Sequence, residues 1–380
     1  MIKKILLIII FLVAISFLFF KEKTFDNNTI YIGSSLPKTG TIKELGTAVE
    51  LGTNAYFDYV NKNHLLKNKK IKLLAYEDKY EPQLTLRNTQ QLLKNKNIFA
   101  LYGFVGSPTV KIILPILRQT NIPFVSAFTG ASFLRNNYYD NIINLRSSYL
   151  QEIEEHIKYL HNEKHFTKIA VFYQNDEYGE DGYIGVVNTL KKYNLSLVAE
   201  GSYKRNTLSI RHAFHSIKDA HPEAIIMVGA NKANSLFIKK AKENPNFIDT
   251  IFCNISFGDA SEMIKDLNGK TKNLLFSQVV PNYEDLSIPV IKEYNKILKE
   301  YDPDFEPSFI SLEAFLSAKT VVKAIKNING SITRGKFLEQ LKKLPKDTLQ
   351  GLEINYINQQ LLNKVYLFKY EDNHFIEIKK

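Results

Sequence analysis

The chain of 380 residues is long enough for about two or three domains. Its 44% apolar and 12% aromatic content excludes a disordered or collagen-like protein. A single cysteine, Cys253, excludes an intramolecular disulfide and a cysteine-based zinc site. The net charge of +11 permits an anionic partner, but no lysine pair lies beside stacking aromatics in a nucleic-acid motif. We therefore expect no nucleic-acid partner and a charge excess spread over solvated surfaces.

Residues 1–24 have the pattern of a signal peptide or an N-terminal membrane anchor. Lys3 and Lys4 precede an almost wholly apolar run at residues 5–20, and charged residues 21–23 follow it. A cleaved export signal and an uncleaved anchor both fit, and these alternatives stay open. The segment has no cysteine, which excludes a lipoprotein anchor. Either alternative places residues 25–380 outside the cytoplasmic membrane, in a periplasmic or other extracytoplasmic space.

The rest of the chain alternates short apolar runs with amphipathic stretches. Runs that predict buried parallel strands are Thr29–Leu36, Lys70–Glu77, Phe99–Phe104, Ile122–Ser126, Lys168–Tyr173, Ser196–Gly201, Ala224–Val228, Thr250–Asn254 and Leu274–Val279. Residues 48–59, 110–117 and 315–325 have apolar positions at helical spacing. The tail predicts close-spaced strands at Leu352–Tyr356, Lys364–Tyr370 and His374–Lys379, the last two forming an antiparallel hairpin. This order predicts an α/β fold with two doubly wound, Rossmann-like lobes, because the strands are too many for one ordinary sheet.

Catalytic motifs are absent from the sequence. There is no Gly-rich phosphate loop, no H-E-x-x-H and no G-x-S-x-G. The histidine pairs at 161/165 and 212/215 lack a nearby third ligand, so a solvated helix surface is the better interpretation of both. Asp176 begins an acidic cluster that we interpret as a helix N-cap and first turn, with a paired-carboxylate site as the alternative. We expect no enzyme, no metal and no cofactor.

Two loops that follow strands have the composition of a ligand site. Ser107-Pro108-Thr109 follows the strand ending at Phe104, and residues 126–131 (SAFTGA) follow the next strand. In doubly wound folds the carboxyl ends of strands bind ligands, and such loops present backbone N–H groups to a carboxylate or similar anion. Ordinary helix capping by serine or threonine is the alternative for each loop alone.

At these loops the sequence resembles a family, the substrate-binding proteins of branched-chain amino-acid-type ABC transporters. The resemblance extends over nearly all of residues 29–380. The motifs that carry it, in order, are residues 32–40 (IGSSLPKTG), 45–46 (LG), 78–82 (DKYEP), 102–103 (YG), 107–109 (SPT), 128–135 (FTGASFLR), 146–149 (RSSY), 173–179 (YQNDEYG) and 308–314 (SFISLEA). The resemblance implies the type I periplasmic-binding fold, with a ligand cleft between two lobes joined by three crossovers.

The resemblance also implies lobe boundaries and site residues. Lobe 1 would hold residues 29–147 and 279–331, lobe 2 residues 148–278 and 335–380, with crossovers near 146–149, 278–281 and 329–334. Ligand contacts would come from Leu45, Ser107, Thr109, Ser126, Phe128, Thr129, Gly130, Tyr149, Tyr178, Asn231, Asn254 and Ser256. The family often has an acidic residue five positions after the crossover arginine, where this chain has Gln151. A buried ammonium needs such a partner, so we expect a carboxylate, amide or other small polar ligand at least as readily as an α-amino acid.

By the same resemblance, the ligand would bridge both lobes and shift an open–closed equilibrium by its differential affinity. The closed protein would deliver it, as a monomer, to an ABC permease in the membrane. A ligand sensor that signals through a membrane protein is the alternative, and an uncleaved anchor would favour it. A hydrolase on the same scaffold is the third hypothesis.

Overall fold

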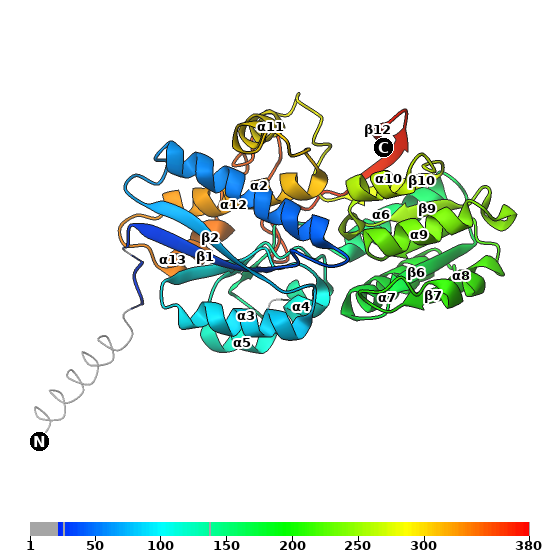
Figure 1. The fold of residues 1–380 in the computed structure, drawn as a ribbon, viewed down its shortest axis with the longest axis horizontal. Helices are drawn as coiled ribbons and strands as arrows, with labels where there is room; N and C mark the ends of the chain where they lie inside the picture. The colour runs from blue at the N-terminus through cyan, green and yellow to red at the C-terminus, as the bar shows by residue number, and fades with distance from the viewer. Residues whose placement is uncertain (1–21, 26, 137, 380) are drawn as a thin grey trace, which may run out of the picture.

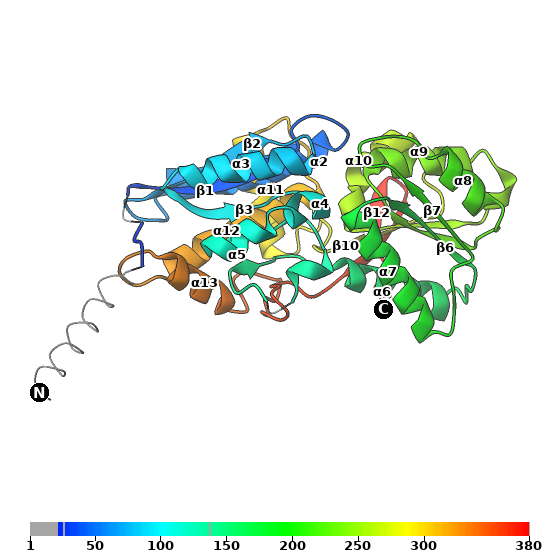
Figure 2. The same ribbon diagram turned by 90° about the horizontal axis from the view of Figure 1, so that it is seen from below.

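The computed structural model describes residues 22–25, 27–136 and 138–379. Two lobes lie side by side along the long axis of the molecule (Figures 1 and 2). The predicted N-terminal signal or anchor falls almost entirely outside the described residues. No helix within the described part of the chain is long and apolar enough to span a membrane.

Lobe 1 is built on a parallel sheet of order β2-β1-β3-β4-β5. Its strands are β1 (Thr29–Leu36), β2 (Lys70–Glu77), β3 (Ile98–Tyr102), β4 (Phe124–Val125) and β5 (Ile142–Ile143). Its helices are α2 (Lys43–Lys62), α3 (Pro82–Lys94), α4 (Ser107–Lys111), α5 (Leu114–Thr120), α11 (Pro289–Tyr301), α12 (Phe309–Lys326) and α13 (Arg334–Lys342), with a 3₁₀ turn η1 (Ser132–Leu134). The predicted parallel connections are confirmed, and β1 and β2 have the expected bounds.

Lobe 2 is built on a mixed sheet of order β12-β11-β10-β9-β8-β6-β7. Its strands are β6 (Ile169–Gln174), β7 (Ala199–Tyr203), β8 (Ala224–Val228), β9 (Ile251–Asn254), β10 (Leu274–Gln278), β11 (Tyr366–Glu371) and β12 (His374–Glu377). Its helices are α6 (Tyr149–Asn162), α7 (Glu177–Lys192), α8 (Arg211–Lys218), α9 (Asn231–Ala241) and α10 (Ala260–Leu267), with 3₁₀ turns η2 (Pro245–Phe247) and η3 (Ser256–Gly258). The antiparallel β11–β12 hairpin is confirmed, and Asp372 and Asn373 both adopt the positive φ that its tight turn requires.

The predicted strand Leu352–Tyr356 is wrong. The segment is irregular, although Leu352 and Ile354 are buried in the core of the molecule. The Ile354 amide donates to the carbonyl of Lys346 instead of to a sheet. Alternating apolar residues indicate that one face of a segment is buried. An irregular segment can bury one face as a strand does, so the alternation alone did not distinguish the two.

Three crossovers join the lobes, but the third does not lie where the sequence predicted. The first two follow β5 and β10, as expected. Residues 329–334 instead connect α12 to α13, and α13 packs against α12 and β5 of lobe 1. The ring of Phe337 packs at a tilt against that of Phe99, with centroids 4.9 Å apart, and Arg334 donates to the Phe99 carbonyl at 2.9 Å. These contacts move the first part of 335–380 into lobe 1, because two apolar turns of α13 complete that core.

The third crossover lies near Leu362. The Leu362 amide donates to the Leu145 carbonyl at 2.8 Å, so the third and first crossovers run side by side. From there the chain enters β11, which pairs antiparallel with β10. All three crossovers therefore lie together at the junction of the lobes, which is the arrangement that permits a hinge.

Close packing in lobe 1 brings α2 against α12. A Cβ on Gly52 would lie 2.2 Å from the Ser311 carbonyl oxygen, so only glycine allows this approach. Both helices point their N-termini toward lobe 2 and their C-termini away from it (Figure 1). The loops before these helices therefore face the second lobe.

Candidate functional site between the lobes

The two lobes are closed on each other. Asn206 of lobe 2 accepts a hydrogen bond from Thr41 at 2.8 Å and donates to Glu81 at 2.7 Å. Arg205 forms an ion pair with Glu81 at 3.2 Å. Further along the interface, Gln174 donates to the Tyr80 hydroxyl at 3.1 Å. These contacts join loops of lobe 1 to loops of lobe 2, so opening the lobes must break them.

The serine- and threonine-rich loops of lobe 1 meet at this interface. The hydroxyls of Ser107 and Thr129 lie 2.7 Å apart, and both side chains are fully buried. The Thr109 hydroxyl donates back to the Gly106 carbonyl at 2.8 Å. Ser126 has a positive φ of 53°, and its buried hydroxyl has no partner among the described residues. The structure thus brings together the two predicted loops, and it leaves one of their hydroxyls free to bind a ligand.

Aromatic side chains of lobe 2 pack together beside these loops. The rings of Tyr149 and Tyr178 lie 5.1 Å apart, and Phe257 lies 4.6 Å from Tyr178. Burial raises the pKa of Tyr149 to about 12, so its hydroxyl stays protonated. The Tyr178 hydroxyl is buried and makes no hydrogen bond within the described part of the chain. A Cβ on Gly130 would lie 2.5 Å from Tyr149, which explains the glycine.

Four other predicted residues have different roles in the fold. Leu45 and Phe128 belong to the apolar cluster that also contains Tyr149 and Tyr178. Asn231 is buried at the start of α9. Asn254 accepts from the Asn234 side chain and donates to the Phe252 carbonyl, so internal contacts already engage it. The ligand role of all twelve predicted residues stays a prediction.

Ser256, the last of the twelve, belongs to a buried ion network that crosses the interface. The Arg146 guanidinium lies 3.3 Å from the Glu313 carboxylate of α12 and donates to the Ser256 hydroxyl. The Ser256 amide and hydroxyl donate to Glu152 of α6, and Ser277 donates to the same carboxylate. Arg146, Glu152 and Glu313 are at most 3% exposed. The network therefore links lobe 1, the first crossover and lobe 2.

Burial raises the pKa values of the two carboxylates in this network. Burial raises the pKa of Glu313 to about 7, and Arg146 opposes this shift. Burial also raises the pKa of Glu152, against Arg146 and the Ser277 and Ser256 hydrogen bonds. The neighbouring Gln151, where a family acid was expected, instead completes a capping box with Ser148.

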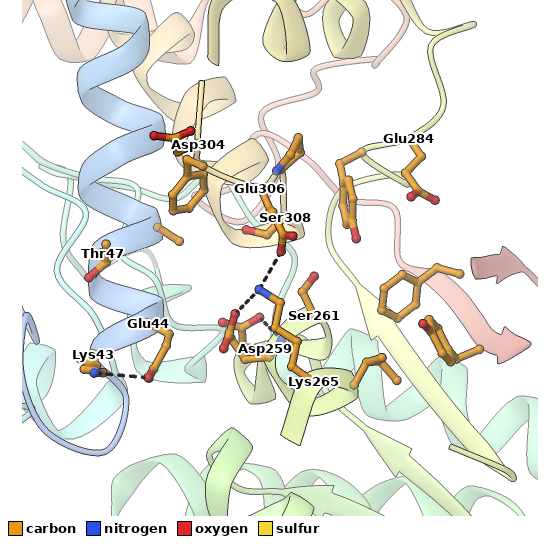
Figure 3. A pocket seen from close by; sticks show the side chains of 18 of the residues that line it. Lys43, Glu44, Thr47, Asp259, Ser261, Lys265, Glu284, Asp304, Glu306 and Ser308 are labelled. Carbon is orange, nitrogen blue, oxygen red and sulfur yellow. Dashed lines mark hydrogen bonds and ion pairs between the residues drawn. The ribbon is translucent and has the colours of Figure 1, made fainter. Parts of the chain in front are cut away.

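A cavity of about 900 Å³ opens between the lobes beside this region (Figure 3). Its walls come from α2 and the loop before α12 in lobe 1, and from α10 and the β11–β12 hairpin in lobe 2. Six carboxylates line it, Glu44, Asp259, Glu262, Glu284, Asp304 and Glu306, against three lysines, Lys38, Lys43 and Lys265. Lys265 is paired with Glu262 at 3.0 Å and with Glu306 at 2.9 Å. None of the twelve predicted residues lines the cavity.

Asp259 is the most buried carboxylate of this cavity. Its side chain is 5% exposed and caps α10 by accepting from the Glu262 amide. Burial raises its pKa to about 7, and the neighbouring Glu262 and Glu44 act in the same direction. The sequence placed this acid after the strand that ends at Asn254, but only the closed lobes bring Glu44 opposite it.

Other candidates have structural explanations. Asp176 is the N-cap of α7, and its carboxylate accepts from the Tyr178 amide at 3.0 Å, as predicted. Cys253 is a buried free thiol. Among the described residues, no three or more His, Cys, Asp or Glu side chains are grouped so that they could hold a metal ion.

The fold and the interface agree with the comparisons with known proteins. Residues 29–374 match the family described as periplasmic binding protein, and the chain belongs to this family. This is a family of extracytoplasmic substrate-binding proteins rather than enzymes.

Individual relatives point in the same direction. A solved structure of a possible leucine/isoleucine/valine-binding protein from Rhodopirellula baltica is 30% identical, with a TM-score of 0.88 over 94% of this chain and 98% of that one. A Leu/Ile/Val-binding protein homolog 7 from Brucella abortus is 20% identical over 79% of this chain and 78% of its own length. A branched-chain amino acid transporter substrate-binding protein from Streptococcus pneumoniae, solved with isoleucine, shares the fold at 16% identity and a TM-score of 0.78, over 92% of this chain and all of that one.

Proposed function

We propose that this protein captures a small polar ligand between its lobes and delivers it to an ABC permease. The observation that carries the proposal is the buried polar surface of the lobe interface. The hydroxyls of Ser126 and Tyr178 are buried there without partners among the described residues. An unsatisfied buried hydroxyl costs about 1–3 kcal/mol, and a ligand bound between the lobes would remove that cost.

The chemistry of the interface supports a ligand with an acceptor group at one end and a cationic group at the other. The Ser107–Thr129 hydroxyl pair suits a carboxylate or amide. Asp259 and Glu44 lie at the adjacent cavity and suit an ammonium group. The sequence has no acidic residue at position 151 to pair with the ammonium group of an amino acid. In this proposal Asp259 and Glu44 take that role. An amino acid or a related small cation therefore becomes the first class to test.

We expect one class of small zwitterion to stabilise the protein in a thermal-shift screen. A ligand at about one hundred times its dissociation constant adds roughly 2.7 kcal/mol to the free energy of unfolding. The panel compares amino acids, amides, short carboxylates and polyamines on protein freed of bound ligand by unfolding and refolding. Tyr149→Phe should abolish much of the shift, whereas Tyr138→Phe, at an exposed ring of lobe 1, should not. Absence of any shift across the panel would count against solute capture.

The pKa of Asp259 predicts a pH dependence of binding for a cationic ligand. Below pH 7 the buried carboxyl is protonated, and above pH 7 it is charged. Affinity for a cation should therefore rise with pH up to about 7, by at most about tenfold per pH unit. Asp259→Asn keeps a helix-capping residue and should flatten this profile. Asp304→Asn, at an exposed carboxylate of the same cavity, is the control. A profile unchanged in Asp259→Asn would show that the ligand cation binds elsewhere.

A further inference from the structure

Positive charge is concentrated at the end of lobe 1 that points away from lobe 2. Segments 65–70, 93–97 and 325–336 contain eight lysines and arginines and no aspartate or glutamate. These residues are Lys67, Lys69, Lys70, Lys94, Lys96, Lys326, Arg334 and Lys336. We call this set the basic end.

Tertiary contacts bring the three segments together. Lys69 donates to the Asn27 carbonyl at 2.9 Å, and the Asn27 and Asn97 side chains are hydrogen-bonded at 3.2 Å. Residues 65–69 and 325–332 share the walls of one cavity of about 420 Å³. Arg334 donates to the Ile98 carbonyl at 2.7 Å. The parallel topology explains most of the cluster, because the C-termini of α2, α3 and α12 and the N-termini of β2 and β3 lie at this end (Figures 1 and 2).

Six of the eight cations of the basic end face solvent. The exceptions are Lys69 and Arg334. Within the described part of the chain, none of the eight forms an ion pair with a carboxylate within 4 Å. The nearby acids are Glu22, which accepts from the Gly335 amide, and Asp140 at the rim. Helix dipoles favour lysine at helix C-termini, which accounts for Lys94 but not for lysines in the turn before β2.

The chain enters lobe 1 at this same end. The Phe25 amide donates to the Ile332 carbonyl at 2.9 Å, and its ring packs edge-on against Phe99 at 4.9 Å. Only four residues separate Phe25 from the apolar run at 5–20. An anchor formed by that run would hold the basic end close to the membrane.

We propose that the basic end docks on a membrane surface that carries anionic lipid headgroups. A lysine near such a surface strengthens binding by roughly fivefold, within a Debye length of about 8 Å. The basic end lies at one extreme of the long axis of the molecule. Docking would therefore orient this long axis roughly perpendicular to the membrane plane. The interlobe cavity would then remain open to solvent, away from the bilayer. This inference does not depend on the identity of the ligand.

The test places a polarity-sensitive dye at each end of the full chain. Cys253 is fully buried, so a dye attaches at an introduced cysteine. Asn68→Cys reports on the basic end and Asp219→Cys on an exposed site of lobe 2. The proteins are reconstituted in phosphatidylcholine vesicles with or without phosphatidylglycerol, at about 0.15 M salt. We expect a blue shift at position 68 only, on anionic vesicles only, and its reversal at high salt.

Charge variants separate docking from anchoring. Lys67→Gln/Lys94→Gln/Lys326→Gln should weaken the docking equilibrium roughly a hundredfold and abolish the shift. A matched triple variant removes three exposed lysines of lobe 2, Lys158, Lys168 and Lys191, and should leave the shift intact. Equal shifts on neutral vesicles, or none on anionic ones, would overturn the proposal. Reversal by soluble polyphosphate at a comparable phosphate concentration would also overturn it, because it would show a general phosphate patch.

Discussion

Replacement of Arg146 by methionine should lower the free energy of unfolding by about 3–5 kcal/mol. The arginine is 1% exposed and lies between the buried carboxylates of Glu313 and Glu152. Its removal leaves both carboxylates and the Ser256 hydroxyl in the core without their cation. The change would be measured by denaturant unfolding, monitored separately from ligand binding.

Two further variants make this expectation specific. Lys192→Met breaks an ion pair whose lysine is 60% exposed, and it should cost at most about 1 kcal/mol. Arg146→Met combined with Glu313→Leu should recover the part of the loss that comes from Glu313, because an apolar pair of similar volume replaces that buried ion pair. Glu152 meanwhile keeps its hydrogen bonds from Ser256 and Ser277. If Arg146→Met lowers the free energy of unfolding no more than Lys192→Met does, the buried ion network does not stabilise the fold.

Gly179→Ala should destabilise the protein by about 3 kcal/mol or more. A Cβ at this position would lie 1.7 Å from the Gln174 carbonyl oxygen, so the backbone of β6 or α7 must move. The shift would displace the adjacent Tyr178 from the lobe interface. Thermal and denaturant unfolding measure the stability, and the ligand-induced thermal shift measures the second effect.

Gly185, in the same helix, provides the matched control. Its added Cβ would meet the flexible ends of Ile153 at 3.1 Å and of Leu150 at 3.7 Å. Alanine favours the helix by about 1 kcal/mol over glycine, so Gly185→Ala should change stability by no more than about that amount. Similar losses of stability in both variants would indicate that α7 tolerates no side chain at either glycine. The clash with the Gln174 carbonyl would then not explain the effect of Gly179→Ala.

Local patterns were sufficient to predict most of the fold. The strands β1, β2 and β8 have the predicted bounds because each is a short apolar run flanked by turn or polar residues. The third crossover was misplaced because residues 329–334 have the composition of a linker. Their true role depends on the contact of Phe337 with Phe99, which lies more than two hundred residues earlier in the chain.

The candidate site was predictable to a smaller extent. The Ser107 and Thr129 loops were found because they follow strands, and sheet topology alone brings such loops together. The carboxylate cavity was missed because Glu44 and Asp259 belong to different lobes. Which side chains face each other across a hinge depends on how two separately folded units meet. The basic end was missed for a related reason, since its lysines come from three distant segments.

The interleaved course of the chain constrains the order in which this protein can be assembled. The lobe 1 core needs α12 and α13, and the lobe 2 sheet needs β11 to cover the edge of β10. Lobe 1 is therefore incomplete until α13 has been made, and lobe 2 is incomplete until β11 has been made. Even a short C-terminal deletion that removes β11 and β12 would expose the edge of β10 to pairing with other chains. Nascent chains of this protein would thus depend on protection from aggregation until β11 has been made and has paired with β10.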